Sequence, residues 1–177
     1  MSVPVNKRTK SQFEAINQFM KLRRDLTELM LNDFGFSIEK QEKKIEKFRQ
    51  IHQSASNIDE QIERWRRKNE SFEAWFVDKE CDALLDILRK IETEFVAGNS
   101  IYPSNTPSKF MEYCERRKHI NNAIAGCYVL KSELNYIINV FPSDINKMSG
   151  FVKRIDEQIA MFKGVRKSDN KFLKGNF

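Results

Sequence analysis

The chain has few cysteines, and their spacing suits neither cross-links nor a metal site. Its 177 residues include three cysteines, Cys81, Cys114 and Cys127, with no Cys-x-x-Cys spacing among them. An odd number of widely spaced cysteines argues against a disulfide framework and against a zinc site. Two of the three fall on or beside apolar helix faces, which favours buried free thiols in a reducing compartment.

Long apolar runs are also missing. The longest nearly apolar run, residues 124–130, is far shorter than the roughly 20 residues that a membrane-spanning helix requires. The first ten residues contain Lys7, Arg8 and Lys10 but no apolar stretch behind them, so we expect no secretory signal. These features predict a cytoplasmic protein without a membrane partner, and its length suits one domain.

Residue types that carry catalysis are scarce. Neither histidine, His52 or His119, has an acidic residue three positions before it, so the Glu-x-x-His pairs of di-iron bundles are missing. The Arg and His spacing of helical HEPN ribonucleases is absent, as are a glycine-rich phosphate loop and a nucleophile elbow. We therefore expect no enzyme activity, no metal and no cofactor, and we expect His119 on a solvated or interfacial face.

What the chain does contain is apolar residues at helical spacing. They recur at steps of four and three residues along three stretches, a pattern typical of helices that pack against similar helices. We interpret these stripes as core, because cofactor sites in bundles need polar residues facing inward. The stripes are Ala15, Phe19, Leu22, Leu26 and Leu29; Ala123, Cys127, Leu130, Leu134, Ile137 and Phe141; and Ile145, Met148, Val152, Ile155, Ile159 and Phe162.

Capping and breaking residues divide the chain into five helical segments. The first begins after Ser11, a candidate N-cap, and ends near Asn32 or Asp33, before Gly35. The others are expected at 38–55, 58–97, 107–141 and 145–167, with capping by Ser37, by Asn57 with Glu60, by Thr106 before Pro107, and by Ser143 or Asp144. The third and longest segment carries the stripe Ile58, Ile62, Trp65, Phe72, Phe76, Ala83, Ile87, Ile91 and Phe95.

Segment lengths predict the architecture. The first two segments together hold about as many residues as the third, which at about 1.5 Å per residue predicts that they run alongside it. We expect an all-α fold, an up-down-up-down four-helix bundle over residues 11–167 from which a charged helical hairpin, residues 38–68, projects. Residues 1–10 would form a basic flexible arm, and residues 168–177 a basic tail.

The net charge of +6 is concentrated at the two ends of the chain. Residues 1–10 contribute +3 and residues 163–177 contribute +4, which leaves −1 for the rest. In the expected topology both ends meet at one end of the bundle, together with the start of the third bundle helix, and such a basic concentration favours a polyanionic partner. The candidate nucleic-acid-binding residues are Lys7, Arg8, Lys10, Arg116, Arg117, Lys118, Lys163, Arg166, Lys167 and Lys171.

A second basic group surrounds Trp65. Arg64, Arg66, Arg67 and Lys68 flank this tryptophan, an arrangement that could stack a base and hold its phosphates. Trp65 also falls on the apolar stripe of its segment, which favours a core or interface tryptophan with solvated arginines. Both interpretations stay open at the level of sequence.

Three short stretches resemble a known family. They are Ser2-Val3-Pro4 with Lys7, Arg8, Ser11, Phe13 and Glu14; Asn99-Ser100-Ile101-Tyr102-Pro103; and Arg166-Lys167-Ser168-Asp169-Asn170-Lys171. They look like prophage- and retroelement-borne four-helix-bundle proteins related to the accessory variability determinant (Avd) of diversity-generating retroelements, themselves similar to the ribosomal RNA intervening-sequence proteins. The resemblance covers most of the chain outside about residues 37–68.

This resemblance implies a non-enzymatic basic bundle that forms ring-like homo-oligomers. It further implies that the protein assists a reverse transcriptase encoded nearby by binding both the enzyme and its template RNA. The matched positions that could contact RNA are Lys7, Arg8, Arg166, Lys167 and Lys171. A homo-oligomer is also favoured by the 14 phenylalanines, more than one bundle core readily absorbs.

The leading hypothesis is a cytoplasmic RNA-binding accessory protein that docks on the reverse transcriptase of a retroelement and helps it use template RNA in cDNA synthesis. The alternative is a structural or adaptor protein of a phage or mobile element that binds only proteins, with the hairpin as its docking arm. A third, weaker hypothesis is a helical nuclease with an unknown motif.

Overall fold

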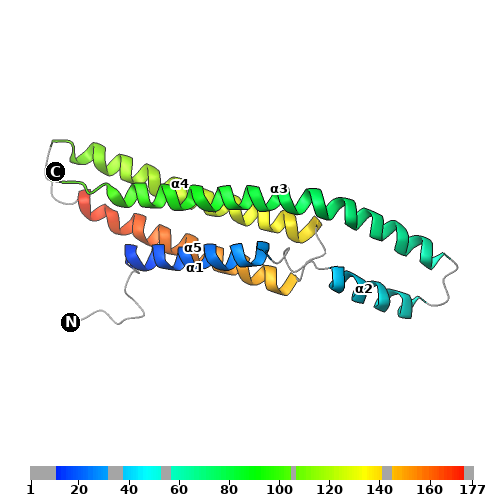
Figure 1. Cartoon of the computed structure of the whole chain (residues 1–177). Helices are drawn as coiled ribbons and strands as arrows, with labels where there is room; N and C mark the ends of the chain where they lie inside the picture. Colours follow the sequence, from blue (N-terminus) through cyan, green and yellow to red (C-terminus); the bar gives the residue numbers. More distant parts are fainter. Residues whose placement is uncertain (1–10, 32–37, 53–56, 105–106, 141–144, 174–177) are drawn as a thin grey trace, which may run out of the picture.

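The regular secondary structure of the chain is helical throughout the residues that the structure describes. The structure is a computed structural model, and it describes residues 11–31, 38–52, 57–104, 107–140 and 145–173. The helices are α1 (Gln12–Leu31), α2 (Ile38–Ile51), α3 (Ile58–Ser100), α4 (Lys109–Val140), α5 (Ile145–Ser168) and the short 3-10 helix η3 (Asp169–Leu173) (Figure 1). The all-α fold class is thus confirmed. None of the helices in these ranges is both long and apolar enough to span a membrane.

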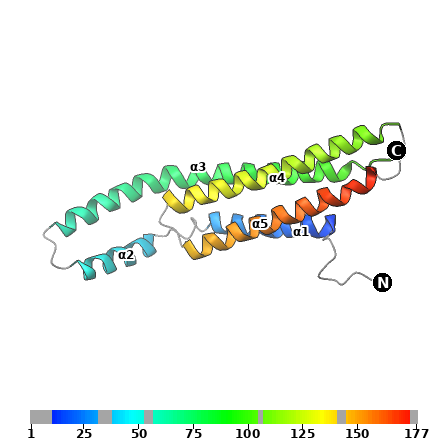
Figure 2. The same cartoon turned by 180° about the vertical axis from the view of Figure 1, so that it is seen from behind.

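Four of the helices pack as a bundle. α3 and α5 each lie against both α1 and α4. Figures 1 and 2, which view the molecule from opposite sides, show these four helices side by side along most of their lengths. Each helix therefore has two neighbours on which to bury an apolar stripe.

The three predicted stripes of α1, α4 and α5 form the core. Every member whose burial the structure describes is buried except Val152, which is partly buried and packs against the same core; the side chain of Ile145 is not among the described ones. Phe162 of α5 is completely buried in this core, and its ring stacks on Phe95 of α3 with the ring centroids 4.3 Å apart. Phe141 lies outside the described residues. Cys127 is buried in the core, and this burial raises the pKa of its thiol to about 12, whereas Cys114 is exposed and Cys81 half-buried.

The stripe predicted for the middle of α3 is wrong by one residue. Ala83 is exposed and Ile87 only half-buried, whereas their neighbours Leu84 and Leu88 are completely buried. With Ile91 and Phe95, these leucines keep the alternating steps of four and three residues. The error arose because Ala83 with Ile87 and Leu84 with Leu88 are two apolar sets with the same helical spacing, so periodicity alone does not show which set faces the core.

Two of the predicted helix ends differ in detail. Ser11 does cap α1, since the backbone N–H of Glu14 donates to its Oγ over 3.1 Å. Asn57 instead accepts from the side chain of Gln61 at 2.8 Å and makes no side-chain cap to the α3 backbone, so the predicted capping box is wrong. α3 also continues past Gly98 to Ser100. Thr106 and the predicted caps at 143–144 lie outside the described residues.

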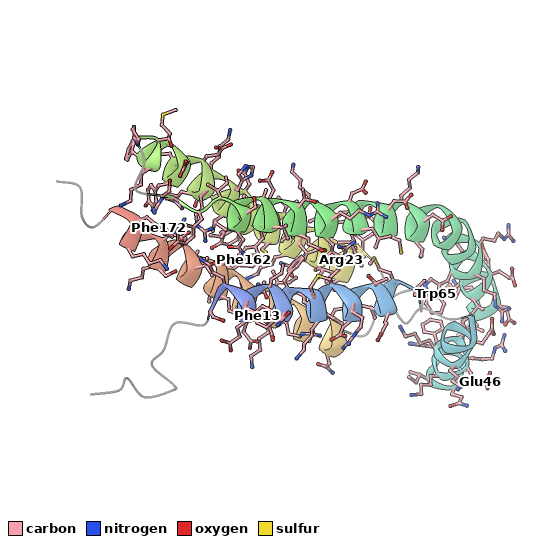
Figure 3. All side chains as sticks on the ribbon, turned by 60° about the vertical axis from the view of Figure 1, so that its left-hand side comes forward. Phe13, Arg23, Glu46, Trp65, Phe162 and Phe172 are labelled. Atoms are coloured by element: carbon pink, nitrogen blue, oxygen red, sulfur yellow. The ribbon has the colours of Figure 1, made fainter. Side chains whose placement is uncertain are left out.

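α2 and the first part of α3 form a small separate apolar contact. Ile45 and Ile62 are both 2% exposed but belong to no part of the main core cluster. Figure 1 shows α2 alongside the start of α3, at the end of the molecule opposite the C-terminus. In Figure 3, Glu46 and Trp65 lie at this end and Phe172 at the other.

The segment after α5 is a docked element rather than a polar tail. Asp169–Leu173 forms η3, which packs against both α4 and α5. Asp169 is 1% exposed and Phe172 is 8% exposed, so this segment buries a carboxylate as well as a ring. The expected basic tail of residues 168–177 is therefore structured at least to residue 173.

Candidate nucleic-acid interface

Arg116, on the second turn of α4, joins three parts of the chain at one end of the bundle. Its Nε donates to Asp169 Oδ2 at 2.9 Å, and its Nη1 donates to the carbonyl oxygens of Gly98 and Ile101 at 2.7 and 3.0 Å. Its Nη2 donates to Asp169 Oδ1 and to Asn99 Oδ1, both at 3.2 Å. The end of α3, the start of α4 and η3 therefore meet around one guanidinium.

This environment corrects the prediction that Arg116 contacts RNA. An arginine side chain has five N–H donors, and each of them here has an acceptor within the protein. Arg116 is 1% exposed, and the side chain of its partner Asp169 is 2% exposed. A buried arginine with all donors used cannot reach a phosphate, so its role is structural.

The ion pair also changes the charge that the C-terminal segment presents to solvent. Asp169 is the only acidic residue between 163 and 177, and Arg116 neutralises it inside the protein. Between residues 163 and 173, the described part of this segment, no carboxylate is therefore exposed. Because Arg116 is buried together with Asp169, the pair adds no net charge, and the fully exposed charges between residues 163 and 173 are those of Lys163, Lys167 and Lys171.

Tyr113 and Asn170 hold Arg117 at the edge of this surface. The Tyr113 hydroxyl donates to Asn170 Oδ1 at 3.2 Å, and Arg117 Nη1 donates to both the Tyr113 hydroxyl oxygen at 2.6 Å and Asn170 Oδ1 at 3.1 Å. Arg117 is half-buried as a result. Part of its charge still faces solvent next to η3.

The other described candidates lie along α4, α5 and η3 at the same end. Lys118, Lys163, Lys167 and Lys171 are exposed, and Arg166 is half-buried. Arg166 Nη1 donates to Asn121 Oδ1 at 2.9 Å, and Lys163 Nζ donates to the Tyr128 hydroxyl at 2.7 Å. These contacts join α5 to α4. We call Arg117, Lys118, Lys163, Arg166, Lys167 and Lys171 the basic end. Lys7, Arg8 and Lys10 lie outside the described residues.

Exposed aromatic side chains adjoin the basic end. Tyr102, in the loop that Arg116 holds, is 74% exposed, and its ring meets Phe172 edge-on with the centroids 5.4 Å apart. Lys171 Nζ lies 5.0 Å from the centroid of the Phe172 ring. Phe110, at the start of α4, is 62% exposed. Large open rings beside cations are the two features that single-stranded nucleic acid needs.

The basic group around Trp65 has a different arrangement. Arg66 donates to Glu42 at 2.8 and 3.2 Å, and Arg64 pairs with Glu60 at 3.3 Å. These arginines are therefore paired with carboxylates, although Arg67 is exposed. Trp65 is half-buried and lines an apolar pocket of about 360 Å³ with Phe48 and Ile62, which agrees with the interpretation of Trp65 as an interface tryptophan.

His119 lies on α4 at its contact with α3, and its side chain is half-buried. Its Nδ1 is 2.8 Å from Glu94 Oε2, and Asn122 Nδ2 donates to the same oxygen at 3.2 Å. The hydrogen bond with His119 holds the pKa of the Glu94 carboxyl below its ordinary value. This interfacial position matches the prediction for His119. Among the described residues, no group of three or more His, Cys, Asp or Glu side chains could hold a metal ion.

The sequence did not reveal that Asn99 and Asp169 share a partner. Both lie in stretches that carry the family resemblance, and Arg116 bonds to both of them. One feature of the sequence could have indicated this: Arg116 lies four residues before Ile120, on the side of α4 that faces the core, where an arginine needs an acidic partner.

Comparison with protein-family models, with curated proteins and with solved structures gives no match to this chain.

Proposed function

We propose that this protein is a non-enzymatic RNA-binding accessory protein that docks on the reverse transcriptase of a retroelement and helps it use template RNA in cDNA synthesis. The observation that carries the proposal is the basic end, where exposed lysines of α4, α5 and η3 gather while Asp169 is neutralised within the protein. Cations grouped in this way release counterions from a nucleic acid when they bind its phosphates. The resemblance to the Avd-related proteins of prophages and diversity-generating retroelements supplies the reverse transcriptase as partner.

The aromatic residues beside the basic end favour single-stranded RNA over duplex. Tyr102 offers an open ring against Phe172, the ring that Lys171 also contacts, and base stacking on such a ring contributes about 1–3 kcal/mol per base. Stacking needs an unpaired base, whereas a duplex presents mainly phosphates and riboses. We therefore propose that a loop or single-stranded segment of the template binds here.

The proposal includes the finer fold that the sequence predicts. In it, four bundle helices alternate in direction and the hairpin, residues 38–68, projects as an arm from the end opposite the basic end. RNA and a protein partner could then bind at opposite ends of one molecule. A homo-oligomer, which the family resemblance predicts as a ring, would bring several basic ends together.

A salt titration of RNA binding tests the proposal. The logarithm of the association constant for a stem-loop RNA should fall linearly with the logarithm of salt concentration, with a slope of about −0.7 for each phosphate that is neutralised on a single strand. Replacing Lys118, Lys163, Lys167 and Lys171 with Gln should weaken binding and flatten that slope. The matched control replaces four lysines of the hairpin, Lys40, Lys43, Lys44 and Lys47, whose charges Glu39, Glu42 and Glu46 offset.

Two outcomes would contradict the RNA-binding mechanism. If the hairpin variant loses RNA binding while the basic-end variant keeps its affinity and salt slope, the hairpin is the nucleic-acid site. If the unaltered protein binds no RNA at low salt, the protein-only adaptor is the better function. One observation favours that adaptor, because the apolar pocket beside Trp65 gives the hairpin a surface suited to a protein side chain.

A further inference from the structure

A line of polar contacts joins α4 to α5 and η3, and it begins at the basic end. α4 and α5 lie side by side (Figure 2), and we call this line of contacts the α4–α5 seam. From Arg117 to Lys131 it spans about 21 Å of helix. In order along α4, the contacts are Arg117 Nη1 to Asn170 Oδ1 at 3.1 Å, Arg166 Nη1 to Asn121 Oδ1 at 2.9 Å, Lys163 Nζ to the Tyr128 hydroxyl oxygen at 2.7 Å, and Lys131 Nζ to the Asp156 carboxylate at 2.7 Å.

The seam carries no exposed carboxylate until its far end. α4 contains no acidic residue from 117 to 131, and Asp169, the one acidic residue from 158 to 173, is buried. Both ranges lie within the part of the chain that the structure describes. The Asp156 side chain is 50% exposed and pairs with Lys131. The seam is therefore positive along most of its length and ends at an ion pair.

Tyr128 adds an aromatic ring to these cations. Its side chain is 48% exposed, and Lys163 Nζ lies 5.3 Å from the centroid of its ring as well as donating to its hydroxyl. At the other end of the seam, Lys171 lies beside the Phe172 ring, against which the exposed Tyr102 packs. An exposed tyrosine with a lysine close by thus occurs twice, and this combination of stacking ring and cation is typical of sites for single-stranded nucleic acid.

We propose that single-stranded RNA bound at the basic end continues along the α4–α5 seam and stacks an unpaired base on Tyr128. This inference rests on the proposed RNA-binding function and adds the path that the RNA follows. Lys163 and Lys167, which are exposed and one turn apart on α5, bind the phosphates that flank the stacked base. The path ends at the Lys131–Asp156 pair, because the exposed carboxylate of Asp156 repels a further phosphate.

The Tyr128 ring favours RNA over an acidic protein segment, which the positive charge of the seam would also attract. Every base has an aromatic face that stacks on an exposed tyrosine, whereas aspartate and glutamate side chains have none. The ring also favours a single strand over a duplex, since paired bases are already stacked on one another and present mainly riboses and phosphates.

Fluorescence anisotropy with an oligouridylate of about 12 nucleotides, a length within the range of single-stranded sites, tests the path. Tyr128→Leu should weaken binding by about fivefold or more, the effect of losing one base stack. The matched control is Tyr136→Leu, because Tyr136 lies on the same helix and is 49% exposed, but is beyond the Lys131–Asp156 pair. This control should bind RNA like the unaltered protein, and both variants should unfold at similar temperatures.

Tyr128→Phe separates stacking from a structural role of the hydroxyl. This variant keeps the ring but removes the oxygen to which Lys163 donates. It should retain most of the RNA affinity that Tyr128→Leu loses. If it binds as weakly as Tyr128→Leu, Tyr128 acts by positioning Lys163, and the proposed base stack is wrong.

Ultraviolet cross-linking of the same RNA, followed by mass spectrometry, tests the path directly. We expect adducts on the peptides that contain Tyr102 and Tyr128. Adducts confined to the Tyr102 peptide, or equal RNA affinities of Tyr128→Leu and Tyr136→Leu, would overturn the path along the seam but leave RNA binding at the basic end intact. An unaltered protein that binds no RNA, or that binds polyglutamate more tightly than RNA, would overturn the proposed function together with this inference.

Discussion

Arg116 and Asp169 lie 53 positions apart in the sequence and form a buried ion pair that ties η3 to the start of α4. The same guanidinium bonds to two carbonyl oxygens at the end of α3, so one side chain organises the loop that carries Tyr102. The basic end depends on this pair for its shape, although neither residue contacts solvent appreciably.

Removing the carboxylate should destabilise the protein strongly. Asp169→Ala leaves Arg116 buried without its anionic partner, and breaking a buried pair in this way costs about 3–5 kcal/mol. Urea unfolding should measure that loss. The double variant Arg116→Met with Asp169→Ala should lose less than the two single variants together, since neither charge is then left unpaired. Equal, additive losses would show that the pair is not coupled.

Two glycines should respond to alanine in opposite directions. At Gly126 the new Cβ would meet Ile91 Cγ1 at 2.6 Å, and overpacking of a core contact costs about 1–3 kcal/mol. At Gly150, also within a helix, no atom lies within 4 Å of the new Cβ. Gly150→Ala should therefore stabilise α5 by about 1 kcal/mol, the difference in helix propensity. Thermal unfolding of both variants checks the close approach of α3 and α4, and stabilisation by Gly126→Ala would contradict it.

The hairpin should be dispensable for folding. Deleting residues 37–68 and joining the ends with a short turn removes Ile45 and Ile62, which pack outside the main core cluster. The remaining body keeps that cluster and should still unfold cooperatively on heating. Loss of a cooperative thermal transition in the deletion variant would show that the hairpin supports the core.

The contact between Arg154 and Asp25 should make stability depend on acid pH. Arg154 Nη2 donates to Asp25 Oδ2 at 2.7 Å, and this bond holds the pKa of the Asp25 carboxyl below its ordinary value of 3.8. A lowered carboxyl pKa adds stability above pH 3.8, and this stability disappears as the pH falls through the lowered pKa. Because both side chains are partly exposed, the contribution is about 1 kcal/mol or less.

Arg154→Met tests this contribution. Its free energy of unfolding should be lower than that of the unaltered protein at neutral pH, and the difference should shrink as the solution is acidified below pH 3.8. Denaturant titrations at several pH values measure both quantities. A difference that stays constant with pH would assign the effect of Arg154 to packing over the Phe151 ring, 5.3 Å away, rather than to the ion pair.

The sequence by itself determined the helical class, the approximate helix bounds and three of the four core stripes. It could do so because the period of an α-helix relates residues three and four apart, which are neighbours in the sequence. Phe19, Cys127 and Phe162 are buried where that period predicts. The same reasoning was wrong at Ala83 and Ile87. The apolar residues Leu84 and Leu88 follow them at the same spacing, and only packing against the neighbouring helices decides which of the two sets is buried.

Only the tertiary structure decided which charged residues face solvent. Arg116 and Lys118 are two positions apart and both basic, yet Arg116 is buried and Lys118 is exposed. The difference arises because Asp169, 53 positions away in the sequence, packs against Arg116 and accepts its hydrogen bonds. The docking of η3 follows from the same contact. The burial of adjacent apolar residues of α4 was also decided by packing, since Val129 is exposed and Leu130 is buried although both are apolar. Local spacing carries helix periodicity, whereas partners distant in sequence meet only after the helices pack.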